Sequence, residues 1–331
     1  MKNYLLVSLA LLSSFATAQN QRGWVVGKDY VAFWEGTSEF KVERSIVPES
    51  WGFEAARCRL WVTDKNSHQL LSLLPGELTA ILKTELQGRI LSDSEGGQFF
   101  TYNSAVSQIE RRGTDGAVLG SFALGDPALL SRVRSLGQVS WGLFLNPDEN
   151  KIWLRQYDEK FQKTKELPVA TAKVIWANPR FLISPESKEL WVGYTASGPT
   201  APYTPIIKKM TSEGKAVAEF TFKEKGIFFD FCFEGEKVLV ARDIPTAPYT
   251  VPVHSFLEEL SPGDLKKSVY SAATNYFIDS VGCTEDSVWM AQRSIFSSDG
   301  SYLVHWKKGD SSAGTIIQKL PASADQLYLC E

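Results

Sequence analysis

The 331-residue sequence predicts an all-β fold built from repeated four-stranded antiparallel units, and one recurring pattern is the main reason. In this pattern a polar turn leads within a few residues into a short strand centred on an aromatic or large apolar residue. The strand centres are Trp61, Phe100, Trp153, Trp191, Leu239, Trp289 and Tyr328. They lie 39, 53, 38, 48, 50 and 39 residues apart, about 44.5 on average. A repeat of this length with several short strands is typical of one blade of a β-propeller.

A duplicated hexapeptide supports the repeat. The sequence Pro-Thr-Ala-Pro-Tyr-Thr occupies 199–204 and returns at 245–250, an offset of 46 residues. A β-sandwich, the other all-β architecture considered, predicts no steady spacing of one turn-and-strand unit. We therefore expect a β-propeller with seven blades, and a six-bladed ring with an irregular edge is the alternative.

Each blade is expected to contain four strands. The strand centre is assigned to the second strand, and a later turn rich in Gly or Pro separates the third strand from the fourth. The apolar stretch before each polar turn is assigned to the innermost strand, as at 139–145, 181–183, 227–233 and 276–282.

The longest spacing, before Trp153, has a local explanation. Asp126 and Pro127 suit the N-cap and the first turn of a helix, and Gly137 can close it. We therefore expect a short helix beginning at 128–130, inserted between two blades.

The two ends of the chain are expected to share one blade. The sequence stops just after Tyr328, which leaves the last blade with its two inner strands. Two strands predicted at 24–34 and 40–46 are too close to Trp61 to form a blade of their own. They would complete the last blade and close the ring. The 313 residues after a leader of 18 agree with seven blades of about 44.7 residues each.

The leader, residues 1–18, is predicted to be a signal peptide. Lys2 precedes an apolar run at 4–12, and Ala16 and Ala18 supply the small side chains that a signal peptidase needs. The run is shorter than the ~20 apolar residues of a membrane span, so no transmembrane anchor is expected. The predicted mature chain, 19–331, is then one β-propeller domain exported to the periplasm or outside the cell, where disulfides can form.

Composition excludes several classes of protein. The chain has 44% hydrophobic residues, enough for a sizeable core, and its 35 basic and 38 acidic side chains give a net charge of −3. Such a charge provides no basic surface for nucleic acid. The three His are far apart and no Cys-x-x-Cys occurs, so we expect neither a zinc nor a haem site. We expect a monomer.

The four cysteines allow one favoured pair. Cys232 and Cys283 lie near the ends of inner strands in adjacent blades and at nearly one height, so they are expected to form a disulfide. Under the same strand alignment, Cys58 and Cys330 differ in height by five residues, about 16 Å, which excludes a bond between them. Four buried free thiols are the alternative, and a Cys58–Cys330 bond would overturn the strand alignment at the ends.

The repeat unit resembles known bacterial repeats. The segments 146–154 and 184–192 resemble repeats of the YVTN type of β-propeller, and 60–70 resembles an NHL repeat. This resemblance implies the ring architecture. It also implies a range of functions, from interaction modules and scaffolds to lactonases and lyases, among which fold alone does not choose.

Polar residues at one position of the repeat are the candidate ligand-binding site. They follow the strand centres by three residues and would lie at one height around the channel mouth, the face where the innermost strands begin. These residues are Asp64, Asn103, Gln156, Tyr194, Arg242 and Gln292, extended by Asp243 and Arg293. Strand ends that become polar as they reach water are the alternative explanation. The duplicated loops place Tyr203 and Tyr249 on the same face, where two Pro per loop would hold each ring rigid for binding.

Two classes of function follow. The first is an exported binding scaffold without a cofactor, whose mouth face holds a peptide, a glycan or a cell-envelope partner. The alternative is a lactonase-like or lyase-like enzyme with Ca²⁺ or Mg²⁺ at the mouth; the candidate ligands by position are Asp64, Asn103, Asn178 and Asp279. No catalytic residue can be assigned. Thermal stabilisation by either cation would favour the enzyme.

Overall fold

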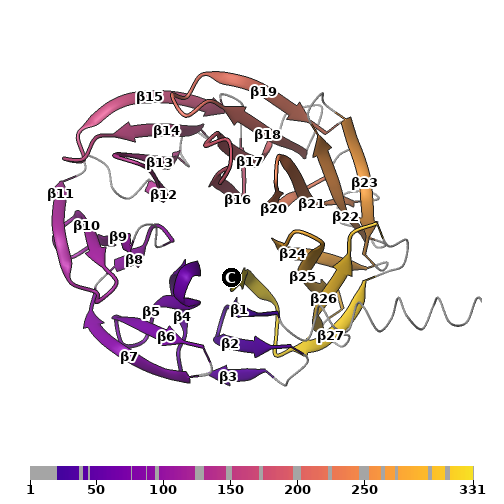
Figure 1. Ribbon diagram of the computed structural model, residues 1–331, viewed down its shortest axis with the longest axis horizontal. Helices are drawn as coiled ribbons and strands as arrows, with labels where there is room; N and C mark the ends of the chain where they lie inside the picture. The colour runs from indigo at the N-terminus through magenta and orange to yellow at the C-terminus, as the bar shows by residue number, and fades with distance from the viewer. Residues whose placement is uncertain are drawn as a thin grey trace, which may run out of the picture.

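The computed structural model describes residues 21–36, 40–43, 45–75, 77–86, 88–93, 97–123, 130–146, 151–170, 174–196, 203–222, 226–245, 253–261, 265–272, 275–296, 300–309 and 314–330. These residues form seven four-stranded antiparallel sheets, which Figure 1 shows arranged as blades in a ring around a central axis. The protein is a seven-bladed β-propeller. The repeat spacing predicted this fold, and the six-bladed alternative is wrong.

The strands follow one order from the channel to the rim in every blade. The innermost strands of blades 1 to 7 are β4 (Pro48–Glu54), β8 (Gly88–Ile90), β12 (Leu130–Leu136), β16 (Val174–Ile183), β20 (Phe228–Glu234), β24 (Tyr276–Cys283) and β28 (Ala324–Leu329). The second strands are β5 (Arg59–Asp64), β9 (Gln98–Asn103), β13 (Val139–Asn146), β17 (Leu190–Ala196), β21 (Lys237–Pro245), β25 (Ser287–Ser294) and β1 (Arg22–Gly27). The third strands are β6 (Gln69–Leu74), β10 (Gln108–Gly113), β14 (Lys151–Tyr157), β18 (Thr204–Met210), β22 (Val253–Ser261), β26 (Ser301–Lys307) and β2 (Tyr30–Glu35). The fourth strands are β7 (Glu77–Glu85), β11 (Val118–Ala123), β15 (Lys163–Ala170), β19 (Ala216–Thr221), β23 (Leu265–Ser271), β27 (Thr315–Leu320) and β3 (Lys41–Glu43). A 3-10 turn, η1 (Ala55–Arg57), separates β4 from β5.

Burial decreases from the second strands to the rim. Every residue of β17 is buried, whereas β11 and β27 consist mostly of exposed and half-buried residues. The difference arises because both faces of an inner strand pack against neighbouring blades. Large aromatic side chains fill these interfaces: the ring of Trp61 stacks on Phe99 of blade 2 at 4.7 Å between centroids. Trp289 packs on Trp34 of blade 7 with the rings tilted by 39° and their centroids 5.9 Å apart.

Blade 3 differs from the predicted strand assignment. The segment 139–145 lies in the second strand β13, not in the innermost strand, and Trp153 lies in the third strand. The innermost strand is β12, in the segment where a helix was expected to begin. The helix prediction is wrong from residue 130 onward, and 124–129 lie outside the described residues. A strand is favoured over a helix here because Val133 is fully buried and its N–H donates to the carbonyl of Leu91 in blade 2, at 2.8 Å. Gly137, at φ +61°, serves the turn from β12 to β13.

The two ends of the chain share blade 7, as expected, but in a different ratio. We expected two strands from each end, whereas the C-terminal segment supplies one strand, β28, and the N-terminal segment supplies three. The predicted strand 24–34 is in fact the hairpin of β1 and β2, which turns at Lys28 and Asp29. β1 pairs directly with β28, from Gly23 opposite Leu329 to Gly27 opposite Ala324. The seventh strand centre therefore lies in an innermost strand, not in a second strand.

Two disulfides join adjacent blades. The expected bond between Cys232 and Cys283 links β20 of blade 5 to β24 of blade 6, with Cα atoms 5.7 Å apart. The prediction for the other pair is wrong, because Cys58 and Cys330 also form a disulfide, with Cα atoms 5.0 Å apart. The shifted strand alignment explains it. Cys330 follows an innermost strand, and Cys58 ends η1 directly after the innermost strand of blade 1, so the two lie at one height.

The covalent bond at the ring closure is supported by a hydrogen bond. The indole N–H of Trp24, in β1, donates to the carbonyl of Cys58 at 2.8 Å. Two disulfides are compatible with an oxidising compartment. Within the residues placed by the structure, no helix is long and apolar enough to cross a membrane. The predicted signal peptide lies outside the described residues.

Candidate functional site

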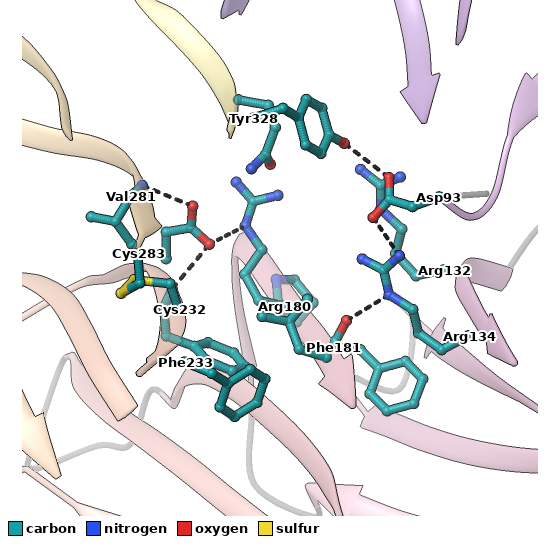
Figure 2. A pocket seen from close by; sticks show the side chains of 15 residues that line it. Asp93, Arg132, Arg134, Arg180, Phe181, Cys232, Phe233, Val281, Cys283 and Tyr328 are labelled. Atoms are coloured by element: carbon teal, nitrogen blue, oxygen red, sulfur yellow. Dashed lines mark hydrogen bonds and ion pairs between the residues drawn. A yellow bond between two sulfur atoms is a disulfide. The ribbon is translucent and has the colours of Figure 1, made fainter. Parts of the chain in front are cut away.

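The central channel contains a chamber lined by six of the seven blades. Its volume is about 310 Å³, and its lining comes from the innermost strands of blades 3 to 7 together with Asp93, which follows β8 of blade 2. We call this cavity the lower chamber, because residues such as Phe233, Cys283 and Tyr328 lie near the ends of their strands, away from the mouth face. Figure 2 shows its charged side chains gathered around one space.

Asp93 is the centre of one polar network in the lower chamber. Its Oδ1 accepts hydrogen bonds from the N–H of Phe53 at 3.0 Å and from the hydroxyl of Tyr328 at 3.1 Å. Its Oδ2 pairs with the guanidinium of Arg134, whose Nε donates to the carbonyl of Phe181 at 3.3 Å. Burial alone would raise the pKa of Asp93, but the charges of Arg134 and Arg132 outweigh burial and hold it below its ordinary value. The network therefore joins blades 1, 2, 3, 4 and 7 around an ionised carboxylate.

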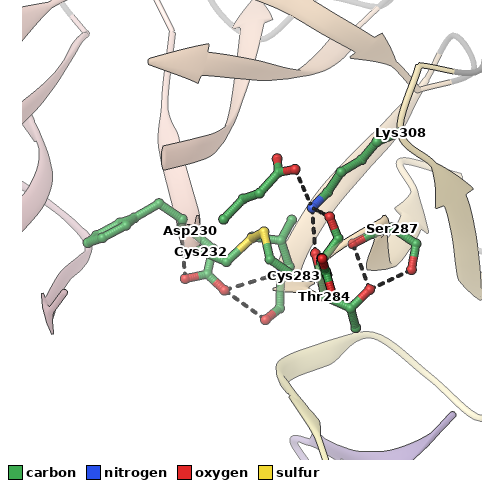
Figure 3. Close-up of a disulfide and its surroundings, with 11 residues drawn as sticks. Asp230, Cys232, Cys283, Thr284, Ser287 and Lys308 are labelled. Atoms are coloured by element: carbon green, nitrogen blue, oxygen red, sulfur yellow. Dashed lines mark hydrogen bonds and ion pairs between the residues drawn. A yellow bond between two sulfur atoms is a disulfide. The ribbon is translucent and has the colours of Figure 1, made fainter. Parts of the chain in front are cut away.

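Asp230 is the centre of a second network. Its Oδ1 lies 3.4 Å from Nε of Arg180 and accepts the N–H of Phe231 at 3.0 Å. Its Oδ2 accepts the hydroxyl of Ser280 at 2.8 Å and the N–H of Val281 at 3.2 Å. Figure 3 shows this carboxylate beside the disulfide of Cys232 and Cys283, so a covalent bond and a polar network hold the same pair of blades.

A second cavity lies at the mouth face. It has a volume of about 260 Å³ and includes the first residues of β20 and β28, so it lies where innermost strands begin. Arg180 lines both this mouth cavity and the lower chamber. Across the mouth cavity, Arg293 holds Asp279 through two hydrogen bonds of 3.0 and 3.1 Å. Burial raises the pKa of Asp279 and also that of Asp325 beside it.

A groove continues from the mouth cavity across blade 6. This outer groove has a volume of about 480 Å³ and shares Arg293 and Ser323 with the mouth cavity. Phe296, which is 46% exposed, and the exposed Lys319 also line it. The mouth face therefore carries a continuous surface with cationic and apolar groups.

The predicted ring of polar residues is mostly buried between blades. Arg293 lines the mouth cavity as described. Five members lie in second strands, where Tyr194 packs in an apolar cluster and the others are hydrogen-bonded within or between blades: Asp64, Asn103, Tyr194, Arg242 and Gln292. Gln156 lies in the third strand β14, near the opposite face, so the equal height assigned to it is wrong. Its side-chain oxygen accepts the hydroxyl of Thr164 at 3.0 Å. Tyr203 is half-buried, and Tyr249 lies outside the described residues.

Arg242 illustrates the structural role of these buried positions. Its side chain is 1% exposed and holds Glu258 through hydrogen bonds of 2.5 and 2.8 Å. The same guanidinium lies 5.1 Å from the ring centroid of Phe222 in blade 4. Gln292 similarly donates to the hydroxyl of Tyr270 in blade 5, at 2.8 Å. These groups join blades to one another.

Asp64 and Asp243 have a common structural role at the mouth face. Each carboxylate accepts the N–H of the residue directly before the innermost strand of its blade: Val47 for Asp64, at 2.9 Å, and Ile227 for Asp243, at 2.5 Å. Their pKa values shift in opposite directions. Burial raises the pKa of Asp243 to about 6. Burial also opposes ionisation of Asp64, but hydrogen bonds from Ser67 and from main-chain N–H groups outweigh it and lower its pKa.

Asp243 should make the protein less stable as the pH rises from about 4 to 6. Its pKa is about 6 in the folded protein against an ordinary 3.8, so the folded state keeps a proton that the unfolded chain has released. The resulting penalty is absent below the ordinary pKa and reaches about 3 kcal/mol above pH 6. We expect Asp243→Asn to remove this part of the pH dependence, as measured by urea unfolding from pH 4 to 7. Asp64→Asn is the opposite control, since it should lose stability toward neutral pH. An unchanged slope in Asp243→Asn would contradict the assignment.

The lower chamber was missed by the sequence reasoning. Its charged residues are Asp93, Arg132, Arg134, Arg180 and Asp230. Arg132 and Arg134 alternate along β12, so they lie on the same side of the strand. The two arginines at alternate positions could have indicated a strand with both side chains on one side, but the helix predicted to begin at 128–130 led to a different assignment.

The cation ligands considered for an enzyme are not gathered. Asp64, Asn103 and Asp279 belong to blades 1, 2 and 6, and each holds a partner within its own blade or the adjoining loop. The side chain of Asn178 lies outside the described part of the chain. Among the residues that the structure places, no group of three or more His, Cys, Asp and Glu is positioned to hold a metal ion.

Comparison with known proteins supports the fold. No family model matches the sequence, and no curated protein matches it. Solved structures do match. A catalytically inactive virginiamycin B lyase from Staphylococcus aureus, determined with quinupristin, has a TM-score of 0.54 and 10% identity, over 83% of this chain and 92% of that chain. The β-propeller domain of Cps50 (Swd1) from Myceliophteria thermophila has a TM-score of 0.56 and 10% identity, over 88% and 94%. A protein of unknown function from Bacteroides caccae has a TM-score of 0.51 and 11% identity, over 94% and 99%. At such identities the likeness shows the β-propeller fold alone.

Proposed function

We propose that this protein is an exported binding propeller that holds an extended segment of a partner protein on its mouth face, without a cofactor. The observation that carries the proposal is the continuity of the mouth cavity with the outer groove through Arg293 and Ser323. Together these cavities offer a path from the channel across blade 6. Signal-peptide features in the leader and the two disulfides support export.

The groove has the chemistry that an acidic and apolar peptide needs. Arg293 and Lys319 are cationic, and the ring of Phe296 is exposed beside them. An exposed aromatic side chain next to an arginine is typical of the residues that dominate protein interfaces. The duplicated loops connect second and third strands in blades 4 and 5, and the described ends of these strands lie at the mouth face. The main chain of Tyr203 is fixed there, since its carbonyl accepts the N–H of Gly226 at 3.0 Å.

A displayed library of random peptides tests the proposal. We expect selected peptides to contain acidic and apolar residues, and to lose about tenfold or more in affinity for the Arg293→Gln or Phe296→Ser protein. Leu119→Ser is the matched control, because Leu119 is 49% exposed on the rim strand β11, away from the mouth. Titration calorimetry measures each affinity.

The duplicated loops provide a second part of this test. Changing Tyr203 and Tyr249 to Ala should alter the free energy of unfolding by less than about 1 kcal/mol while weakening peptide binding. A library that yields no peptide dependent on Arg293 or Phe296 contradicts the proposal. Binding of glycans with that dependence would assign the face to a glycan instead. A rise in melting temperature with Ca²⁺ or Mg²⁺ would favour the hydrolase or lyase alternative.

A further inference from the structure

We propose that the lower chamber is a separate binding site for a small organic carboxylate, an anion of one charge with an apolar body. This site is distinct from the groove on the mouth face and does not depend on the function proposed for it. Arg132 and Arg180 would hold the carboxylate, and the aromatic wall of the chamber would contact the apolar body.

The charges of the chamber do not balance. Three guanidinium groups, Arg132, Arg134 and Arg180, face two carboxylates, Asp93 and Asp230, among the described lining residues. Both carboxylates are already held by hydroxyl and main-chain N–H groups as well as by arginine. Arg134 pairs with Asp93 and Arg180 with Asp230, so among the described residues that line the chamber the charge of Arg132 is in excess, and a ligand with a single negative charge would neutralise it.

The arginines also act on one another. Burial lowers the pKa of Arg132, and the nearby charges of Arg134 and Arg180 lower it further, against the opposing effect of Asp93. Arginine remains protonated despite such shifts. Arg132 and Arg180 also donate hydrogen bonds to neutral acceptors. Arg132 donates to the main-chain carbonyl of Trp51 at 3.3 Å, and Arg180 donates to the main-chain carbonyl of Asp325 at 3.4 Å. An anion between them would relieve their repulsion, and guanidinium groups suit a carboxylate because they donate two parallel hydrogen bonds.

One part of the chamber wall is aromatic. Phe181, Phe231 and Phe233 line it, and the rings of Phe231 and Phe233 meet edge to face at 5.8 Å between centroids. Phe181 and Phe231 are 2% exposed, so the half-buried Phe233 presents most of the apolar surface. Figure 2 shows Phe181 and Phe233 on one side of the chamber, with the guanidinium groups of Arg134 and Arg180 beyond them. A volume of about 310 Å³ is at the lower end of the range for small-molecule sites. This pairing of aromatic wall and guanidinium favours a carboxylic acid over inorganic phosphate, which has no apolar body and carries a second negative charge.

Titration calorimetry of the full exported chain tests this with three probes. Hexanoate has both features of the proposed ligand, hexanamide lacks the charge, and inorganic phosphate lacks the apolar body. We expect hexanoate to bind at least about tenfold more tightly than either of the others. Arg132→Gln should weaken hexanoate binding about tenfold, since it removes the excess charge while Arg134 still pairs with Asp93. Arg57→Gln is the matched control, because Arg57 is exposed on η1 and its loss changes the net charge equally.

A second variant, which increases the positive charge of the chamber, provides the test if Arg132→Gln fails to fold. Asp230→Asn raises the excess to two positive charges and should increase phosphate affinity relative to hexanoate. Melting curves establish that each variant is folded. Equal binding of hexanoate and hexanamide, tighter binding of phosphate by the unmodified protein, or an unchanged preference in Asp230→Asn would overturn the carboxylate site. None of these results bears on peptide binding at Arg293 and Phe296, so the two proposals fail separately.

Discussion

Deleting residues 19–46 should abolish cooperative unfolding and drive the protein into aggregates. The deletion removes β1, β2 and β3, which supply three of the four strands of blade 7. It leaves the innermost strand β28 with an unpaired edge and exposes the neighbouring blades, and such edges promote aggregation. It also removes Trp24, Tyr30 and Trp34, which are at most 1% exposed. Size-exclusion chromatography and thermal melting measure the outcome.

Two milder variants show whether the effect belongs to the closing strands. Deleting 19–20 alone keeps Gln21, whose carbonyl accepts the N–H of Gly36 at 2.7 Å, and should leave the melting temperature unchanged. Changing Cys58 and Cys330 together to Ser cuts the bond across the closure but keeps every strand. It should cost about 2–5 kcal/mol while unfolding stays cooperative. A folded monomer with an unchanged melting temperature after deletion of 19–46 would contradict closure by blade 7.

Arg242→Met should lower the free energy of unfolding by about 3–5 kcal/mol, because it leaves a buried carboxylate without its partner. Arg242 is 1% exposed, and both of its hydrogen bonds to Glu258 lie between β21 and β22. Since Arg242 was a candidate ligand residue, the result also tests whether this position stabilises the fold. Urea unfolding at neutral pH provides the measurement.

A double variant separates the pair from its individual charges. Arg242→Met with Glu258→Leu removes both charges and should recover most of the lost stability. The matched control is Lys237→Met in the same hairpin, where Lys237 is 48% exposed and lies 3.3 Å from Glu259. That change should cost less than about 1 kcal/mol. Equal losses in Arg242→Met and Lys237→Met would contradict the structural role of Arg242.

Local pattern was enough to predict the repeated architecture. A polar turn, a short strand and a buried aromatic centre recur because every blade packs the same element against its neighbours. Trp61, Trp191 and Trp289 lie in second strands as predicted. The pairing of Cys232 with Cys283 followed from the same repeat, since both cysteines lie at similar positions in adjacent blades.

That pattern alone does not show whether a given strand is the innermost, second, third or fourth strand of its blade. A short apolar strand looks alike whether it lies innermost or second, because both are buried, and this ambiguity misplaced Tyr328 and 139–145. The error then excluded the Cys58–Cys330 bond, which depends on relative height at the ring closure.

The sequence by itself thus determined the blade, the number of repeats and the sharing of one blade by the two ends. Only the tertiary structure decided that β28 is innermost, that 130–136 form a strand, and that Arg132, Arg134 and Arg180 meet in one chamber. The physical reason is the range of the interactions. Turn chemistry and hydrophobic patterning act within a few residues, whereas strand position and channel lining depend on contacts between blades that lie far apart in the sequence.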